Sequence, residues 1–144
     1  MSAKSNRVEK SPLGAGNARS NQRHARRRFL LALRELDDAW MAAFNESGFG
    51  DIYFSRLFTE LWLRESVAVS KTDAYALVKG VSVQTAMKYV NRAIADGYLE
   101  EHDNAADGRS RLIRMSPKLR DRFAQVIDRA NAAFLDILNE SEPG

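Results

Sequence analysis

The fold of this chain is decided by residues 70–115, which read SKTDAYALVKGVSVQTAMKYVNRAIADGYLEEHDNAADGRSRLIRM. At the start of this stretch, Ser70 precedes Asp73 by three residues. This is the spacing of a capping box, in which a hydroxyl and a carboxylate satisfy the first free amides of a helix. The pattern predicts a short helix that ends at Lys79, with Gly80 as the left-handed residue after its last turn.

A second helix is predicted directly after this turn. Ser82 is a good N-cap residue, and Gly97 closes the segment over residues 83–96. The apolar side chains of this segment follow the i, i+3, i+4, i+7 spacing of one helical face: Ala86, Tyr89, Val90 and Ala93. Two short helices joined by a tight turn that contains glycine are typical of a helix-turn-helix.

A β-hairpin is predicted to follow the two helices. Residues 98–102 and 109–115 read as short strands, and the pair Asp107-Gly108 between them is a hairpin turn signal. The order helix, tight turn, helix and hairpin predicts a winged helix-turn-helix, in which the hairpin is the wing.

Further helices are predicted on both sides of this unit. Apolar periodicity predicts a helix over residues 22–46 and another from Asp51 to about Glu65. Ser116-Pro117 is a good start for a long final helix over residues 117–139. Residues 67–69 form at most a brief strand.

The expected fold class is therefore mainly α with a small β-hairpin wing. We expect a single winged-helix domain over residues 21–144, in which residues 51–116 form a DNA-binding core. Residues 22–46 and 117–139 are candidate dimerisation helices. Residues 1–20 are rich in Ser, Asn, Gly and Ala and are predicted to be a disordered basic tail.

Composition excludes several classes of protein. The 144 residues include no Cys and only 2 His, so disulfides, zinc-thiolate sites and His-rich metal sites are unsupported, and no metal or cofactor is expected. No apolar run approaches the roughly 20 residues that a membrane helix needs. The basic N-terminus lacks the apolar segment of a secretory signal. We therefore expect a cytoplasmic protein without a membrane partner.

The second helix of the pair carries the candidate recognition residues, because such a helix lies in the DNA major groove with its N-terminal residues facing base edges. Gln84 can pair with adenine and Lys88 with guanine, while Arg92, one turn further, suits a phosphate. The complete candidate set is Ser82, Gln84, Thr85, Met87, Lys88 and Arg92. A merely solvated face is the alternative, and the capped helix and tight turn before it favour DNA.

The predicted wing supplies the second candidate contact. Arg109 and Arg111 place two guanidinium groups on a protruding loop, and arginine suits a narrow minor groove. Asp107 is expected to brace Arg109 through a salt link. Three acids on the same ribbon would repel phosphate unless they point away: Glu100, Glu101 and Asp103. An ordinary surface turn is the alternative interpretation.

These residues carry a resemblance to a known family. Residues from about 51 to 118 resemble the winged-helix core of MarR-type transcriptional regulators, in the stretches VSVQT (81–85), DGYLE (96–100) and DGRSRLIRMSPK (107–118). The last stretch is the most specific, since it has an Asp-x-Arg, a strand and a Ser-Pro helix start. The resemblance implies a homodimer on a pseudo-palindromic site in double-stranded DNA, with Arg109 in the minor groove.

The resemblance has one departure and one further implication. Family members usually carry two helices after the wing, whereas only one long helix fits after Ser116. Family members also often bind a small aromatic or phenolic effector. Four aromatic side chains could line such a pocket, although aromatic residues at helical spacing are more often core, which is the interpretation we favour: Trp40, Phe44, Phe58 and Trp62.

The basic charge near the N-terminus has two interpretations. Residues 1–28 hold eight basic residues and one acid, whereas the whole chain has a net charge of only +3. Arg26, Arg27 and Arg28 could contact phosphates as flexible basic arms do, or could belong to a solubilising tail.

Three functional classes were weighed against these residues. A sequence-specific DNA-binding transcriptional regulator is the leading hypothesis. A winged-helix protein-interaction or RNA-binding module is the alternative, because fold does not fix function. An enzyme is disfavoured, since the sequence has no nucleophile motif, phosphate-binding glycine loop or paired carboxylates at a convincing spacing.

Overall fold

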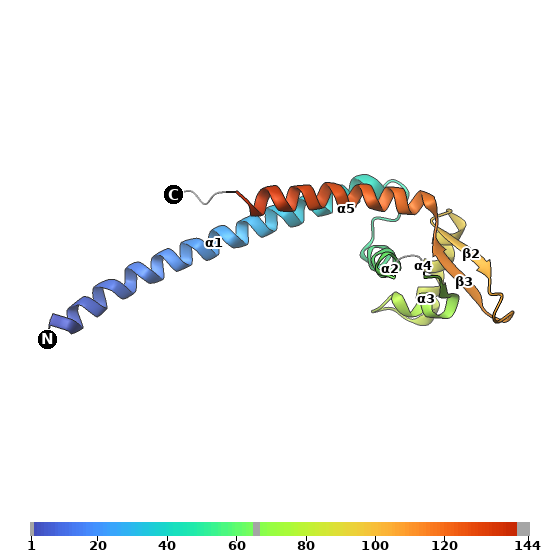
Figure 1. Ribbon diagram of the computed structural model, residues 1–144, viewed down its shortest axis with the longest axis horizontal. Helices are drawn as coiled ribbons and strands as arrows, with labels where there is room; N and C mark the ends of the chain where they lie inside the picture. Colours follow the sequence, from blue (N-terminus) through green and yellow to red (C-terminus); the bar gives the residue numbers. More distant parts are fainter. Residues whose placement is uncertain (1, 65–66, 141–144) are drawn as a thin grey trace. The chain divides into compact units, whose positions relative to one another are not determined.

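The computed structural model describes the backbone of residues 2–64 and 67–140 and the side chains from residue 16 onward (Figure 1). The chain forms two compact units, one of residues 2–38 with 129–140 and one of residues 39–128. The single domain over 21–144 stays a prediction, and the first and last helices both continue past the boundary of the 39–128 unit, which has its own core.

The first helix is longer than the sequence predicts. Helix α1 spans Ser2–Phe44, so the backbone is helical where a disordered tail was expected over residues 1–20. Residues 16–22 are exposed in this helix. Helical hydrogen bonds are local and join residues four apart, so the segment can be helical without burying a core. A lack of apolar side chains therefore predicts a lack of core burial and leaves helix formation open.

Aromatic side chains build the core of the 39–128 unit. Helix α2, Ile52–Leu63, begins at Asp51, whose Oδ1 accepts a hydrogen bond from the Tyr53 amide at 2.6 Å. Its buried face meets the last turn of α1 and the turn that follows it. Five aromatic rings form a connected cluster in which neighbouring ring centroids lie between 4.3 and 6.3 Å apart: Trp40, Phe44, Phe49, Phe54 and Phe58.

The candidate effector-lining aromatics belong to this core. Phe44 and Phe58 are completely buried, and Trp40 is 9% exposed. Trp62 packs against Phe123 with a centroid distance of 5.7 Å. The structure therefore agrees with the favoured interpretation, in which these side chains belong to the core.

Both helices of the helix-turn-helix begin where their N-caps predict. Helix α3 spans Lys71–Leu77 and helix α4 spans Val83–Ala95, and the hydroxyls of Ser70 and Ser82 each accept a hydrogen bond from an amide three residues on. Gly80 has φ +88° and Gly97 has φ +78°, the left-handed conformation that glycine adopts without strain. Helix α3 ends two residues before the predicted Lys79.

The wing belongs to a three-stranded antiparallel sheet in the order β1-β3-β2. Strands β2, Leu99–Asp103, and β3, Arg111–Met115, form the hairpin, with Leu99 opposite Met115 and Asp103 opposite Arg111. Strand β1, Val69–Ser70, adds to the other edge of β3. Figure 1 shows the hairpin beside α3 and α4. The predicted class, mainly α with a small β wing, is confirmed.

One long helix follows the wing within the described residues. Helix α5 spans Pro117–Leu138, and the buried Ser116 hydroxyl accepts a hydrogen bond from the Leu119 amide at 3.1 Å. In the smaller unit, Arg129 of α5 lies 3.4 Å from the Glu35 carboxylate of α1.

Candidate nucleic-acid interface

Helix α4 is amphipathic, and its polar face is open to solvent. Three small side chains are buried against the core: Ala86, Val90 and Ala93. On the other face Gln84 and Lys88 are exposed, and Met87 is 38% exposed. The helix is therefore fixed on its apolar side and presents an amide and an ammonium group side by side, one turn apart.

The first turn of α4 uses two of the candidate hydroxyls internally. The Ser82 Oγ accepts a hydrogen bond from the Thr85 amide at 3.2 Å and donates one to the Thr85 Oγ1 at 3.1 Å. Ser82 is exposed and Thr85 is half-buried. These two residues therefore shape the start of the helix, and Gln84 and Lys88 are the side chains that project from it.

Tyr89 joins α4 to the start of α2. Its hydroxyl donates a hydrogen bond of 2.5 Å to the Asp51 Oδ2, and its ring lies edge-on to Phe54 at 4.6 Å and to Tyr53 at 5.5 Å. Burial of the phenol, and then the adjacent Asp51 carboxylate, raise the pKa of Tyr89 to about 12. The hydroxyl consequently stays protonated and keeps donating.

The guanidinium of Arg92 packs against residues of its own chain, whereas the sequence suggests a phosphate contact for it. Its guanidinium carbon lies 4.9 Å from the ring centroid of Phe49 and 5.7 Å from that of Phe54, and its Nη2 lies 3.4 Å from the Ser47 carbonyl oxygen. The contact joins residues 45 positions apart in the sequence. No local pattern could have predicted it.

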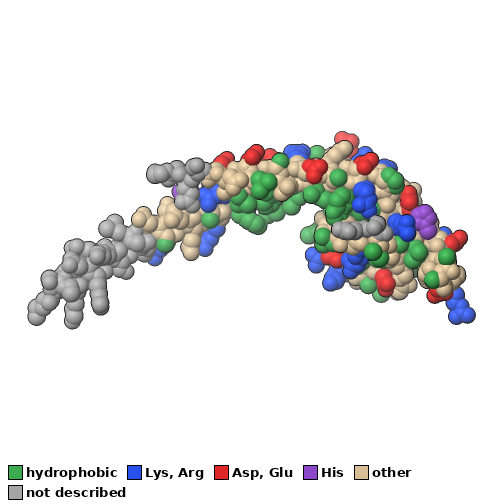
Figure 2. Space-filling view, viewed as in Figure 1, with side chains coloured by type: hydrophobic (Ala, Val, Ile, Leu, Met, Phe, Trp, Pro, Cys, Tyr) green, Lys and Arg blue, Asp and Glu red, His purple; other side chains and the backbone are tan. Residues whose placement is uncertain are grey.

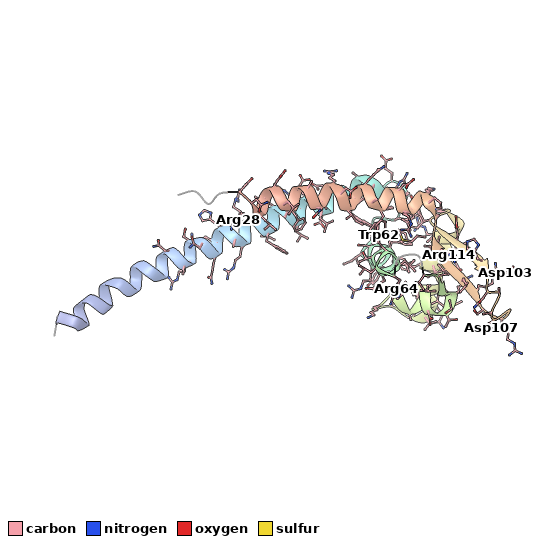
Figure 3. All side chains as sticks on the ribbon, in the orientation of Figure 1. Arg28, Trp62, Arg64, Asp103, Asp107 and Arg114 are labelled. Atoms are coloured by element: carbon pink, nitrogen blue, oxygen red, sulfur yellow. The ribbon has the colours of Figure 1, made fainter. Side chains whose placement is uncertain are left out.

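The tip of the wing presents Arg109 to solvent. The Asp107 Oδ1 accepts a hydrogen bond from the Arg109 backbone amide at 3.0 Å, so this carboxylate shapes the loop in place of the expected salt link to the guanidinium. A second hydrogen bond, which the side-chain amide of Asn104 donates from Nδ2 to the Ser110 hydroxyl at 2.8 Å, closes the loop across its base. Figure 3 labels Asp107 at this tip, and Figure 2 shows a basic side chain projecting there.

Arg111 differs from Arg109 because it is paired along the hairpin. Its Nε lies 3.2 Å from the Glu101 carboxylate, and its Nη1 contacts the Asp103 carboxylate. Lys71, at the start of α3, lies 3.1 Å from the same Glu101 oxygen. The hydrogen bond from Lys71, followed by that from Arg111, lowers the pKa of Glu101 below its usual value.

This network pairs two of the three acids on the wing with basic side chains. Glu101 and Asp103 are neutralised by Lys71 and Arg111, and the third acid, Glu100, lies 3.2 Å from His102. The wing therefore pairs Glu101 and Asp103 with basic side chains along its strands and carries an unshared positive side chain at its tip among the contacts described for residues 104–110.

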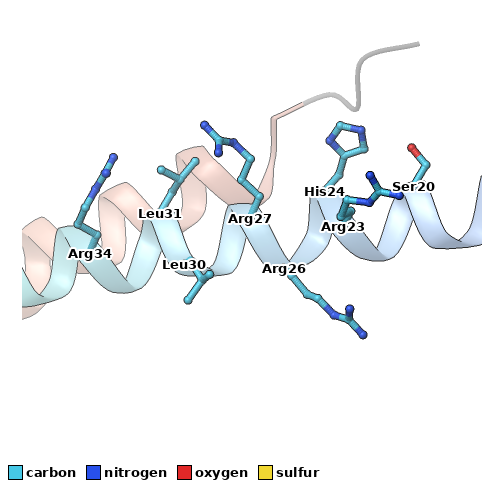
Figure 4. A pocket seen from close by; sticks show the side chains of 8 residues that line it. All are labelled: Ser20, Arg23, His24, Arg26, Arg27, Leu30, Leu31 and Arg34. Carbon is cyan, nitrogen blue, oxygen red and sulfur yellow. The ribbon is translucent and has the colours of Figure 1, made fainter.

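Basic side chains also line a groove on α1. The groove has a volume of about 740 Å³, and Figure 4 shows its lining: Ser20, Arg23, His24, Arg26, Arg27, Leu30, Leu31 and Arg34. Arg28, the third candidate arginine of this segment, is half-buried and is not among the lining residues. The candidate arginines thus divide between an open groove and a partly covered position.

Two residues without a predicted role in the candidate interface hold its elements together. Asp51 is predicted only as the start of a helix, yet its carboxylate caps that helix and also accepts the Tyr89 hydrogen bond. Lys71 has no predicted role, yet it pairs with Glu101 of the wing. Among the described residues, no helix has both the length and the apolar character needed to cross a bilayer.

Comparisons with known proteins give matches in structure alone. No protein-family model matches the chain, and no curated protein matches its sequence. Among solved structures, a transcriptional regulator from Thermotoga maritima is 21% identical, with 83% of this chain and 78% of that chain covered and a TM-score of 0.57. The RV1404 protein from Mycobacterium tuberculosis is 14% identical, with 92% and 82% covered and a TM-score of 0.66.

A third neighbour is a mutant of MarR from E. coli that was solved in complex with operator DNA. It is 13% identical, with 90% of this chain and 81% of that chain covered and a TM-score of 0.52. At these identities the likeness is one of fold, and it shows that the chain has the winged-helix fold of MarR-type transcriptional regulators.

Proposed function

We propose that the chain is a sequence-specific, double-stranded DNA-binding transcriptional regulator that acts in the cytoplasm as a homodimer on a pseudo-palindromic site. The observation that carries the proposal is the polar face of α4. Gln84 and Lys88 are exposed there, while the opposite face of the helix is buried in the core. The structural neighbour that is bound to operator DNA supports the same function for this fold.

The exposed side chains of α4 match the chemistry of the major groove. A glutamine side-chain amide can donate to N7 of adenine and accept from its N6 amino group as a bidentate pair, and a lysine ammonium can donate to guanine O6 and N7. Met87, 38% exposed beside them, can contact a thymine methyl group. Together these groups can distinguish base pairs, which a uniformly basic face could not do.

Arg109 is the wing residue that we assign to the minor groove. Its side chain is exposed, and its backbone is fixed by the Asp107 carboxylate. An arginine is weakly hydrated and is attracted by the enhanced negative potential of a narrow minor groove. Arg111 has a supporting role, because its guanidinium neutralises Glu101 and Asp103.

The wing network favours duplex DNA over the alternative partners. Unpaired acids on the wing would favour a protein or RNA partner over duplex DNA. Glu101 is shared between Lys71 and Arg111, and Asp103 is paired with Arg111, so the repulsion that such acids would cause is reduced. The α1 arginines Arg26 and Arg27 are assigned to secondary phosphate contacts, which would add to the salt dependence of binding.

The homodimer is supported by apolar side chains on the smaller unit. Four large hydrophobic residues are between 52% and 60% exposed there: Phe29, Leu30, Leu135 and Leu138. A second copy of the chain would cover them. In sedimentation, Leu135→Glu should shift the protein toward monomer, whereas Leu63→Glu, at a 69% exposed position of α2, should leave the dimer intact.

The proposed function is tested by a binding comparison on three nucleic acids. Duplex DNA, single-stranded DNA and RNA of one sequence are titrated with the intact protein, together with a second duplex of unrelated sequence. The proposal expects duplex DNA to bind most tightly and the double variant Gln84→Ala/Lys88→Ala to lose its preference among duplexes. Gln125→Ala, an exposed change on α5, is the matched control. Equal binding to all three nucleic acids would contradict the proposal.

A further inference from the structure

The turn between α1 and α2, residues 47–51, is fixed to the core of its unit. The Trp40 Nε1 donates a hydrogen bond to the Gly50 carbonyl oxygen at 2.9 Å. Phe49 is completely buried, with its ring 4.3 Å from Phe54 and 4.6 Å from Tyr98 between centroids. This turn, which we call the 47–51 turn, is therefore a rigid part of the core rather than a free loop.

Two side chains of α4 rest on the 47–51 turn. Tyr89 donates its 2.5 Å hydrogen bond to Asp51, and Arg92 lies over the Phe49 ring with its Nη2 3.4 Å from the Ser47 carbonyl oxygen. Residues 89 and 92 are three apart, so they contact the turn from adjacent turns of α4. Arg92 is also four residues after Lys88, which places the contact beside the polar face.

The backbone of the turn leaves room for Arg92. Gly48 has φ +79°, and a Cβ atom built on it would lie 2.2 Å from the Arg92 Nη2. A side chain at position 48 would have to push the guanidinium away from the turn. The left-handed glycine and the arginine are thus fitted to each other.

This contact matters because the remaining anchors of α4 are small. Its buried face consists of Ala86, Val90 and Ala93, which oppose rotation of the helix about its axis less than long side chains would. A rotation of about 20° moves side chains at a radius of about 5–6 Å by roughly 2 Å. Hydrogen bonds to bases tolerate a few tenths of an ångström, so such a rotation would break them.

We propose that Tyr89 and Arg92 are positioning residues, which lock α4 against the 47–51 turn so that Gln84 and Lys88 face the base edges. The proposal rests on the proposed DNA-binding function and deepens it. It assigns Arg92 to the turn instead of to a phosphate. Sequence selectivity then depends on residues 47–51, although they are separate from the residues assigned to read bases.

A pair of glycine substitutions tests the assignment. Gly48 and Gly97 have φ +79° and +78°, so Gly48→Ala and Gly97→Ala incur the same left-handed backbone strain. Only Gly48→Ala displaces Arg92, because a Cβ at position 97 meets nothing within 4 Å. The measured quantity is the ratio of affinity for a selected operator to affinity for a random duplex.

The expected result is a selective loss. Gly48→Ala and Tyr89→Phe should lower the ratio roughly tenfold, the order of one good base contact, while Gly97→Ala and Tyr53→Phe should not. General destabilisation would reduce binding to both duplexes alike and leave the ratio unchanged. An unchanged ratio in Gly48→Ala and Tyr89→Phe would overturn the proposal.

A second arm separates positioning from phosphate contact. Arg92→Gln should lower the ratio and leave the slope of log affinity against log salt unchanged, and its effect should not add to that of Gly48→Ala. A slope reduced by about 0.9 would instead identify a phosphate contact and overturn the proposal. If the unaltered protein failed to distinguish operator from random duplex, the proposed function itself would be wrong, which is a separate result.

Discussion

The two arginines of the wing should contribute differently to DNA binding, although they are only two residues apart. Arg109 is exposed, and Asp107 holds its backbone amide at 3.0 Å. Removing a guanidinium that enters a groove costs ~1–3 kcal/mol, so Arg109→Ala should weaken operator binding by about 5- to 150-fold. If the group also neutralises a phosphate, the salt slope should fall by about 0.9.

Arg111→Ala provides the contrast. The Arg111 guanidinium already pairs with Glu101 and Asp103, and exposed pairs of this kind are worth ~0–1 kcal/mol each. Its removal should therefore leave the salt slope nearly unchanged and should weaken binding less than Arg109→Ala does. Apart from the contribution of those ion pairs, the free energy of unfolding of both variants should lie within about 0.5 kcal/mol of that of the parent.

The assay is a fluorescence-anisotropy titration of an operator duplex at four or more salt concentrations, together with urea unfolding of each variant. Unfolding identifies any variant whose binding falls through loss of folded protein. The reasoning about the wing is refuted if Arg109→Ala binds like the parent. It is also refuted if Arg111→Ala lowers both affinity and salt slope as much as Arg109→Ala does.

Three further predictions concern stability and pH. Phe58→Ala should reduce the free energy of unfolding by ~3–5 kcal/mol in urea titrations, because the ring is completely buried among aromatic neighbours; a loss below about 1 kcal/mol would contradict the described core. Tyr89 should ionise near pH 12 in absorbance titrations, and Tyr89→Phe should remove this step. Because the pKa of Tyr89 is raised, the stability that Tyr89 contributes is complete below pH ~10 and is lost as the pH rises through 12. A titration in which all tyrosines ionise together near pH ~10 would contradict this prediction. Glu101 has a lowered pKa, so its contribution to stability is present above its ordinary value of 4.5 and is lost as pH falls below it. Glu101→Gln should flatten the melting temperature between pH 6 and pH 3, and an equal acid dependence in parent and variant would count against the pairing with Lys71.

Local features of the fold were predictable from the sequence because their causes are local. The hydroxyls of Ser70, Ser82 and Ser116 each cap the helix that they were expected to begin. Gly97 adopts the predicted left-handed conformation directly after α4, and Gly80 adopts it in the turn between α3 and α4, three residues after α3 ends. Such interactions join residues three to five apart, so a short stretch of sequence contains all the information that they need.

Features that depend on distant partners were not predictable in the same way. The Val69–Ser70 strand finds its partner more than 40 residues later, in β3. The contacts of Arg92 with the 47–51 turn, and of Lys71 with Glu101, likewise join separate elements. Arg109 and Arg111 look alike in the sequence, and only the strand register, which sets Arg111 opposite Asp103, distinguishes the paired arginine from the unshared one.

The helical start of the chain illustrates a different gap. Low apolar content over residues 1–20 argues against a packed core, and residues 16–22 are indeed exposed. A helix can nevertheless persist on local hydrogen bonds alone, and α1 begins at Ser2. Lack of a core and lack of secondary structure are separate conclusions, and composition supports only the first.

The central claim is that α4 reads a duplex while Arg109 holds the neighbouring groove. Selection of bound sequences from a random duplex pool tests it most directly. The account predicts enrichment of an inverted repeat whose half-sites are centred about one helical turn, roughly 34–36 Å, apart, and loss of that enrichment in Gln84→Ala/Lys88→Ala. A pool that remains random after repeated rounds would contradict it.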